Sequence, residues 1–193
     1  MTNLEIAAVL RRLADMMDLR GDNGFKIRAY RNAADVIEDH PTPLVELHSA
    51  GGVAALQTLP GIGTAISQKI ADLLATGTFK AYAEIQKEIP LSTLDLLRVE
   101  GVGMKTAQTL YRQFQLTNLE DFAKFIAGGG LDCLPNLGER SQEKMRASVN
   151  GLLAVEVMRL WPEIGAPVVT PTDRASMLSG PSGSTPTGIS FNK

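Results

Sequence analysis

Several residue types are scarce in this chain, and each shortage excludes a class of protein. The single cysteine, Cys133, has no second thiol to pair with, which excludes an intrachain disulfide scaffold and fits a reducing compartment such as the cytoplasm. One cysteine and two histidines are too few for a structural zinc site, which takes about four such ligands. No apolar run approaches the roughly 18 residues of a membrane span, and the first residues do not resemble a signal peptide. We therefore expect a cytoplasmic protein with no membrane partner.

An excess of positive charge is also missing. The 19 Lys and Arg residues are outnumbered by 21 Asp and Glu, which gives a formal net charge of −2. This balance excludes a polycation that binds nucleic acid through its overall field, so any such binding must use local features. Aromatic residues make up only 5% of the chain, but hydrophobic residues make up 44%. This composition predicts a folded core built mainly from aliphatic side chains and methionine.

The residues up to 161 show helical periodicity and contain no convincing alternating strand, so the predicted fold is an all-α helical bundle. We expect Asn3 to cap the first helix, and Gly21 and Gly24 to end it. The apolar stripe of that helix is predicted to comprise Leu4, Ile6, Val9, Leu10, Leu13, Met16 and Met17. A second helix is predicted from Phe25 to Asp39, with Ala29, Ala33, Val36 and Ile37 on its inner face. Shorter helices are predicted over 43–50 and 52–58.

A short motif is repeated along the chain. Residues 59–63 read LPGIG, and forty residues later residues 99–103 read VEGVG, each followed by a helical pattern. A weaker copy, LPNLG at 134–138, has Asn136 in place of the first glycine. Two helices joined by a tight glycine-hydrophobe-glycine turn are typical of the helix-hairpin-helix motif. The sequence therefore predicts two such motifs and a degenerate third.

The turn itself suggests what it binds. Its glycines permit unusual backbone angles and a close approach by another chain, and its central hydrophobe (Ile62, Val102 or Leu137) is expected to point into the core. The amides that follow lie at a helix N-terminus, where free N–H groups and the helix dipole favour an anion such as a DNA phosphate. Main-chain donors do not distinguish bases, so binding is expected to be independent of sequence. The predicted phosphate-binding residues are Gly61, Ile62, Gly63, Thr64, Gly101, Val102, Gly103 and Lys105. The third hairpin either contacts DNA, with Arg140 beside it, or is only a structural turn.

Other residues have two interpretations. The short stretch that holds Arg20, Lys26, Arg28 and Arg31 against Asp22 is either a solvated helix face or a DNA contact, and we favour the contact for Lys26, Arg28, Tyr30 and Arg31. Tyr111 and Trp161 are expected to pack against helices, and Cys133 is expected to be a buried thiol.

The composition changes after Trp161. Residues 162–193 are rich in Pro, Gly, Ser and Thr and have too few apolar side chains to offset the entropy of ordering, which predicts a disordered tail. A short segment at Ile189 or Phe191 would suit docking to a repair protein. The predicted organisation is a domain over 1–88 with the first hairpin, a domain over 89–161 with the second and third, and the tail over 162–193.

Three stretches, residues 23–34, 59–77 and 101–103, resemble the N-terminal part of bacterial family X DNA polymerases, the group related to DNA polymerase beta. The resemblance implies a lyase-type domain followed by a hairpin domain that grips gapped, nicked or ended duplex DNA. After the third hairpin the family continues into a palm domain with paired metal-binding aspartates, whereas here the only acid beyond Glu163 is Asp173. We therefore expect that this chain alone does not polymerise DNA.

The resemblance also implies a candidate enzyme site. The family's Schiff-base lysine, which removes 5′-deoxyribose phosphate, falls on Lys69, and Lys26 and Tyr30 match its phosphate pocket. Departures from the polymerase beta pattern weaken the pocket, and they lie at Phe25, Gln57, Ala65 and Ala81. Lys80 is the candidate to replace Lys69 as the nucleophile. The alternative for Lys69 is that it has no catalytic role and is simply a solvated lysine on its helix.

Three functions follow, and no cofactor is required for the first. The chain is predicted to be a sequence-independent DNA-binding protein of repair. The alternatives are a 5′-deoxyribose-phosphate lyase, and an interaction module or accessory chain of a split family X polymerase. The resemblance further implies a Na⁺ or K⁺ ion at each hairpin, held by main-chain carbonyls of Leu59, Ile62, Val99 and Val102.

Overall fold

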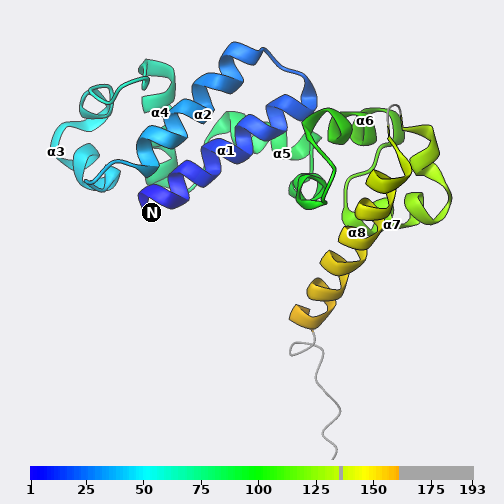
Figure 1. Cartoon of the computed structure of the whole chain (residues 1–193). Coiled ribbons are helices and arrows are strands. Elements are labelled where there is room, and N and C mark those ends of the chain that lie inside the picture. Colours follow the sequence, from blue (N-terminus) through cyan, green and yellow to red (C-terminus); the bar gives the residue numbers. More distant parts are fainter. Residues whose placement is uncertain (135–136, 161–193) are drawn as a thin grey trace, which may run out of the picture. The chain divides into compact units, whose positions relative to one another are not determined.

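The computed structural model describes residues 1–134 and 137–160. In these ranges every regular element is helical, which confirms the all-α prediction. The elements in chain order are α1 (Asn3–Arg20), α2 (Gly24–Glu38), α3 (Leu44–Leu56), α4 (Thr64–Thr76), α5 (Lys80–Glu88), η1 (Leu91–Arg98), α6 (Met104–Phe114), α7 (Leu119–Ala127), η2 (Gly130–Cys133) and α8 (Glu139–Leu160), where η denotes a 3₁₀ helix (Figure 1).

Residues Met1–Ala154 form one compact unit, and the sites described below lie within it. The predicted boundary between residues 88 and 89 stays a prediction. The predictions for Asn136, Trp161 and the tail over 162–193 lie outside the described residues.

The start of α1 differs from the prediction by one residue. Thr2 is the N-cap, because its side chain accepts from the amide of Glu5 while the Glu5 carboxylate accepts from the amide of Thr2. The side chain of Asn3 instead bonds to the loop before α3, where its Oδ1 accepts from the amide of Leu44 at 2.8 Å. Gly21 ends the helix in the left-handed conformation, as predicted. Gly24 was wrongly assigned to that end, since it begins α2.

Helices α1 and α2 pack along a buried apolar stripe. Five of the seven residues predicted for the α1 stripe are buried, namely Ile6, Leu10, Leu13, Met16 and Met17. Leu4 was wrongly included and is 62% exposed. It lies two residues, or about 200° of helix rotation, from Ile6 and so faces away from the core. In α2, Ala33 and Ile37 are buried as predicted, whereas Ala29 is exposed because it lines the cavity described below.

The segment before the first hairpin is helical in two pieces. Gly52 has φ 63° and ψ −152°, which breaks α3 internally. Two helical pieces are therefore present as predicted, but the break lies at Gly52 rather than at residue 51, and the second piece ends at Leu56 rather than at residue 58. The second piece leads into the turn at 59–63, and α3 packs against α4 after that turn.

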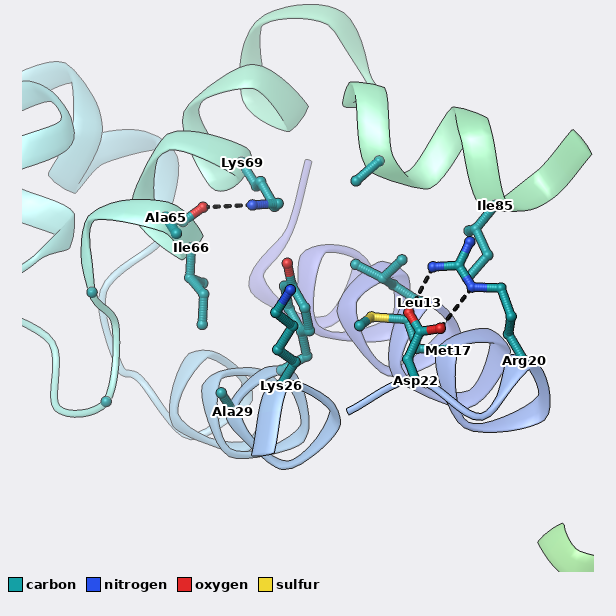
Figure 2. Close-up of a pocket in the computed structure, with 14 residues that line it drawn as sticks. Leu13, Met17, Arg20, Asp22, Lys26, Ala29, Ala65, Ile66, Lys69 and Ile85 are labelled. Carbon is teal, nitrogen blue, oxygen red and sulfur yellow. Dashed lines mark hydrogen bonds and ion pairs between the residues drawn. The ribbon is translucent and has the colours of Figure 1, made fainter. Parts of the chain in front are cut away.

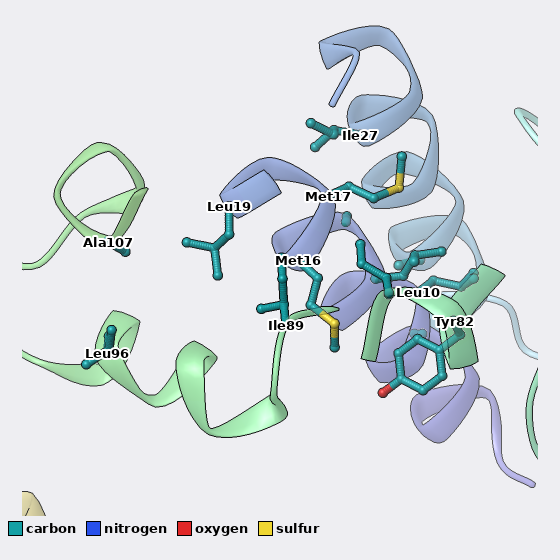
Figure 3. Packing of buried hydrophobic residues seen from close by; sticks show 14 of the residues in the cluster. Leu10, Met16, Met17, Leu19, Ile27, Tyr82, Ile89, Leu96 and Ala107 are labelled. Atoms are coloured by element: carbon teal, nitrogen blue, oxygen red, sulfur yellow. The ribbon is translucent and has the colours of Figure 1, made fainter. Parts of the chain in front are cut away.

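The C-terminal half of α1 reaches the elements around the second hairpin. Leu19 is fully buried together with Leu96 of η1 and Ala107 of α6 (Figure 3). Polar contacts reinforce this packing, because Gln108 Nε2 donates to the carbonyl of Asp18 at 2.7 Å and Arg112 Nε donates to the carbonyl of Leu19 at 3.2 Å. These side chains bond to carbonyls in the last turn of α1, where that of Asp18 also accepts from the amide of Gly21 at 2.9 Å. In the described ranges, no helix is both long and apolar enough to cross a bilayer.

Candidate nucleic-acid interface

The two better hairpin turns have the same backbone geometry. The first glycine of each lies in the left-handed region, with φ 76° at Gly61 and 90° at Gly101. The second glycine caps the following helix in an extended conformation, with φ −82° at Gly63 and −87° at Gly103. A left-handed residue is costly for any side chain, so the repeated glycine has a conformational cause.

The hydrophobe between the glycines anchors each turn. Ile62 is 3% exposed and Val102 is 5% exposed, which confirms that both point inward. Their amides close the turns by donating to the carbonyls of Leu59 and Val99, at 3.1 and 3.0 Å. The turn is thus fixed from inside, and its outer side is left to the glycines.

The outer side presents free amides at the N-termini of α4 and α6. In these helices the first backbone acceptors are the carbonyls of the capping glycines, with Ser67 N to Gly63 O at 3.0 Å and Ala107 N to Gly103 O at 2.9 Å. Within the described residues, no acceptor is bonded to the amides of Gly63, Thr64, Ala65, Gly103, Met104 and Lys105. Each hairpin therefore offers a cluster of unpaired donors at the positive end of a helix dipole, which suits one phosphate.

The space around the glycines differs between the two hairpins. A Cβ atom built on Gly61, Gly63 or Gly103 would meet no atom of residues 1–134 and 137–160 within 4 Å, so in this part of the chain these positions are open to an approaching ligand. A Cβ on Gly101 would lie 3.3 Å from Met145 Cε of α8. Met145 of α8 therefore lies beside the first glycine of the second turn, and no atom of the described residues takes the corresponding place at Gly61.

The third copy of the motif is only partly described. Gly138 precedes α8, and its carbonyl accepts from the amides of Ser141 and Gln142 in the pattern seen at Gly63. Asn136 is outside the described residues, so contact of this hairpin with DNA stays a prediction. Cys133, at the end of η2, is exposed rather than buried. The prediction was wrong because the flanking Leu131 and Leu134 take the core positions and leave Cys133 outside.

A cavity of about 600 Å³ lies beside the first hairpin. It brings together Lys26 and Tyr30 from α2 and Lys69 from α4, which the sequence predicted for one pocket. The turn glycines Gly61 and Gly63, predicted to bind phosphate, also line it. Most of its wall is apolar, with contributions from Leu13, Met17, Ile66 and Ile85 (Figure 2) and from Ala81. A mostly apolar hollow with a few convergent polar groups is typical of a ligand site.

Lys69 is half-buried at this cavity. Its Nζ donates to the carbonyl of Ala65 at 3.0 Å (Figure 2). The same atom lies 5.9 Å from the centre of the Tyr30 ring. Among the described residues no carboxylate is ion-paired with it. Lys80, the alternative nucleophile, does not line the cavity, is 90% exposed and lies 3.9 Å from Glu84. The roles of Lys80 and Lys69 as nucleophiles stay predictions.

The basic stretch is less available than its sequence suggests. Arg31 Nη2 lies 2.9 Å from both Asp15 Oδ1 and Asp18 Oδ2, which raises the pKa of Arg31 and ties α2 to α1. Arg20 is paired with Asp22 and Glu88, and the hydrogen bonds from Arg20 lower the pKa of Asp22. These pairings leave little free positive charge on the two arginines for a phosphate. Lys26 and Arg28 are exposed and have no ion pair within the described residues.

The predicted cation sites use backbone atoms alone. The carbonyls of Ile62 and Val102 accept no hydrogen bond from the described residues, while those of Leu59 and Val99 each accept one. No cluster of three or more His, Cys, Asp or Glu residues suited to a metal occurs in the described part of the chain. Backbone carbonyl oxygens can replace the hydration shell of a monovalent cation such as K⁺.

Comparison with known proteins agrees with this geometry. Residues 1–79 match a family described as a helix-hairpin-helix domain, and residues 53–117 match a SAM-like helix-hairpin-helix tandem. The chain is 28% identical over 141 residues to the DNA polymerase/3′-5′ exonuclease PolX of Bacillus subtilis, covering 73% of this chain and 24% of that protein. It is 27% identical over 119 residues to DNA polymerase lambda of Rattus norvegicus, covering 62% of this chain and 19% of that protein.

These matches confirm both the helix-hairpin-helix interpretation and the resemblance to family X polymerases. The chain nevertheless spans less than a quarter of the length of either relative.

Proposed function

We propose that this chain, whose residues 1–117 carry helix-hairpin-helix domains, binds DNA in repair by gripping phosphates of gapped, nicked or ended duplex. One observation carries the proposal. Two turns forty residues apart present the same cluster of unpaired amides at the N-terminus of a helix. Such donors contact the backbone and not the base edges, so binding is independent of sequence.

The energetics suit a protein with no net positive charge. Each phosphate receives several charge-assisted hydrogen bonds from N–H groups that otherwise bond to water. Two hairpins on one chain also act together, because binding of the first phosphate raises the effective concentration of the second site. Lys105, which is exposed and follows the second turn, adds one long-range attraction.

The test obstructs the amides without straining the fold. Gly63 and Gly103 have backbone angles open to any residue, and space surrounds both. Gly63→Val or Gly103→Val places a branched side chain where a phosphate would approach. Each variant is expected to lower affinity for gapped duplex by on the order of tenfold or more, which corresponds to losing about 1.4 kcal/mol of charge-assisted hydrogen bonding. Fluorescence anisotropy with labelled duplexes measures the affinity.

A matched control separates obstruction from damage to the helices. Gly151 of α8 also has no atom within 4 Å of a built Cβ, so Gly151→Val makes the same chemical change away from both turns. This variant is expected to bind as the wild type does, and circular dichroism checks that helix content is unchanged in all three. Wild-type affinity in both hairpin variants would contradict the proposal.

A second candidate function is removal of 5′-deoxyribose phosphate. The observation that favours it is the cavity, in which Lys69 Nζ lies beside Tyr30, Lys26 and the first turn. The neutral amine would attack the sugar aldehyde and lose water to form an imine. Loss of a C2′ proton would then break the C3′–O bond and release the DNA strand. Hydrolysis of the imine would return the amine.

Borohydride trapping distinguishes the two functions. A duplex with a 5′-deoxyribose phosphate is expected to form a reduced covalent adduct with the wild type and with Lys80→Ala, and none with Lys69→Ala. Lys69→Arg serves as the control that keeps the charge without the nucleophile. If the wild type forms no adduct although it binds the same duplex, the chain is a binding protein only.

The proposal has three finer parts. A Na⁺ or K⁺ ion at each hairpin, held by the carbonyls of Ile62 and Val102 with those of Leu59 and Val99, would help to fix the turns. It predicts weaker DNA binding when choline replaces both ions at constant ionic strength. We also propose that residues 162–193 bind a repair protein and that the protein acts in the cytoplasm, both from composition alone.

A further inference from the structure

The second hairpin carries an acidic residue next to its proposed phosphate site, where a negative charge is unfavourable. Glu100 immediately precedes Gly101, in the turn that presents the amides of residues 103–105. The corresponding residue in the first hairpin is Pro60, which has no charge. A carboxylate beside a phosphate site repels the ligand, and the repulsion acts over the roughly 10 Å that salt at about 0.1 M allows.

Helix α8 contacts this turn at three points, two at Glu100 and one at Gly101. Lys144 Nζ lies 3.0 Å from Glu100 Oε1, the amide of Glu100 donates to Ser148 Oγ at 3.0 Å, and buried Met145 packs beneath Gly101. The three residues recur at helical spacing, so one face of α8 meets the turn. At Gly61, by contrast, a built Cβ would meet no atom of the described residues within 4 Å.

We propose that α8 prepares the second hairpin for phosphate, with Lys144 neutralising the Glu100 carboxylate and Ser148 fixing its backbone. The proposal rests on the proposed DNA binding and assigns a role in it to residues outside the turns. Stability alone does not account for the ion pair. Lys144 and Glu100 are 59% and 64% exposed, and exposed pairs contribute little to folding. Its effect is on the field that an approaching phosphate meets.

The charge effect is separable from a direct contact by a double-mutant cycle. In Lys144→Ala the carboxylate is uncompensated, and affinity for gapped duplex at low salt is expected to fall on the order of fivefold. Glu100→Gln removes the charge but keeps the length of the side chain and the backbone amide that donates to Ser148. This variant is expected to bind gapped duplex at least as tightly as the wild type does. In the Glu100→Gln background, Lys144→Ala is then expected to change affinity less than twofold.

The control is Lys124→Ala on α7, which removes the same charge from another exposed pair, with Asp121 at 3.4 Å. It is expected to change affinity less than twofold. An equal loss from Lys144→Ala in both backgrounds, with a salt dependence reduced by about one phosphate contact, would mean that Lys144 binds DNA itself and would overturn the proposal.

Ser148→Ala gives a second readout, since it removes the acceptor of the Glu100 amide without changing charge. It is expected to weaken binding by a factor that does not depend on salt, whereas unchanged affinity would overturn the positioning role. These failures are distinguishable from failure of the proposed function. If the wild type does not bind gapped duplex, DNA binding is refuted, whereas binding without coupling between Lys144 and Glu100 refutes only the role of α8.

Discussion

The left-handed glycines allow a quantitative test of the hairpin geometry. Gly61, Gly77 and Gly101 have φ of 76°, 74° and 90°, and alanine at any of them must adopt a conformation that L-residues disfavour. This backbone penalty is about 1–2 kcal/mol per residue. Around Gly61 and Gly77 there is open space, so the free energy of unfolding should fall by that amount alone in Gly61→Ala and in Gly77→Ala.

Gly101→Ala should be more costly because of Met145. The added Cβ would lie 3.3 Å from Met145 Cε and 3.5 Å from Met145 Cγ, and Met145 is fully buried. Overpacking of this kind adds about 1 kcal/mol or more, so the total loss is expected to be about 2–3 kcal/mol. Methionine is flexible, which keeps the expected value at the low end of the overpacking range.

Urea denaturation followed by circular dichroism measures all three variants under one condition. Gly77→Ala, at the end of α4 and outside both turns, gives the pure backbone cost. A loss for Gly101→Ala no larger than that for Gly77→Ala would refute the contact between α8 and the second turn. Losses below about 0.5 kcal/mol in all three would refute the left-handed geometry itself.

Further predictions concern charge, pH and accessibility. Arg31→Ala should leave DNA affinity and its salt dependence unchanged because Arg31 is already paired with two aspartates, whereas Lys105→Ala should reduce the slope of log K against log salt by about 0.9. Because the pKa of Asp22 is lowered in the folded state by hydrogen bonds from Arg20, its contribution to stability is present above the unfolded pKa of about 3.9 and is lost as the pH falls further. Asp22→Asn should therefore flatten the acid limb of a stability–pH curve, and an unchanged curve would contradict the pairing. Cys133 should react with a thiol reagent in the native protein at a rate near that of the unfolded chain, whereas protection would restore the buried assignment.

The parts of the fold that the sequence predicts well are those fixed by local constraints. Gly61, Ile62 and Gly63 must supply a left-handed residue, an inward anchor and an open cap within three positions, and few other structures satisfy all three. The same constraints recur at 101–103, so the repeat can be recognised from the sequence without any knowledge of packing. The kink at Gly52 can be predicted for the same reason, because it depends on the conformation of a single glycine.

Some errors had a local signal that favoured the correct answer. Thr2 and Glu5 have the spacing of a capping box, which identifies Thr2 and not Asn3 as the cap. Leu4 could have been excluded by its angular distance from Ile6 along the helix. In both cases the residue type suits the assigned role, but its exact position along the helix does not.

Other features depend on tertiary contacts, which periodicity does not reveal. Arg31 lies in a basic stretch, but Asp15 and Asp18 reach it from the preceding helix, 16 and 13 residues earlier. The contact of Lys144 with Glu100 joins residues 44 positions apart. Exposure of Cys133 likewise depends on which neighbours of a short 3₁₀ helix take the core positions.

The most direct test of the account follows individual backbone amides during DNA binding. In a ¹⁵N–¹H correlation spectrum of the full chain titrated with a short gapped duplex, the largest shifts are expected at residues 63–65 and 103–105. The same shifts should occur with duplexes of unrelated base sequence and should diminish as salt is raised. If DNA binds but the resonances of both sets of amides do not move, the claim that these amides hold the phosphates is contradicted.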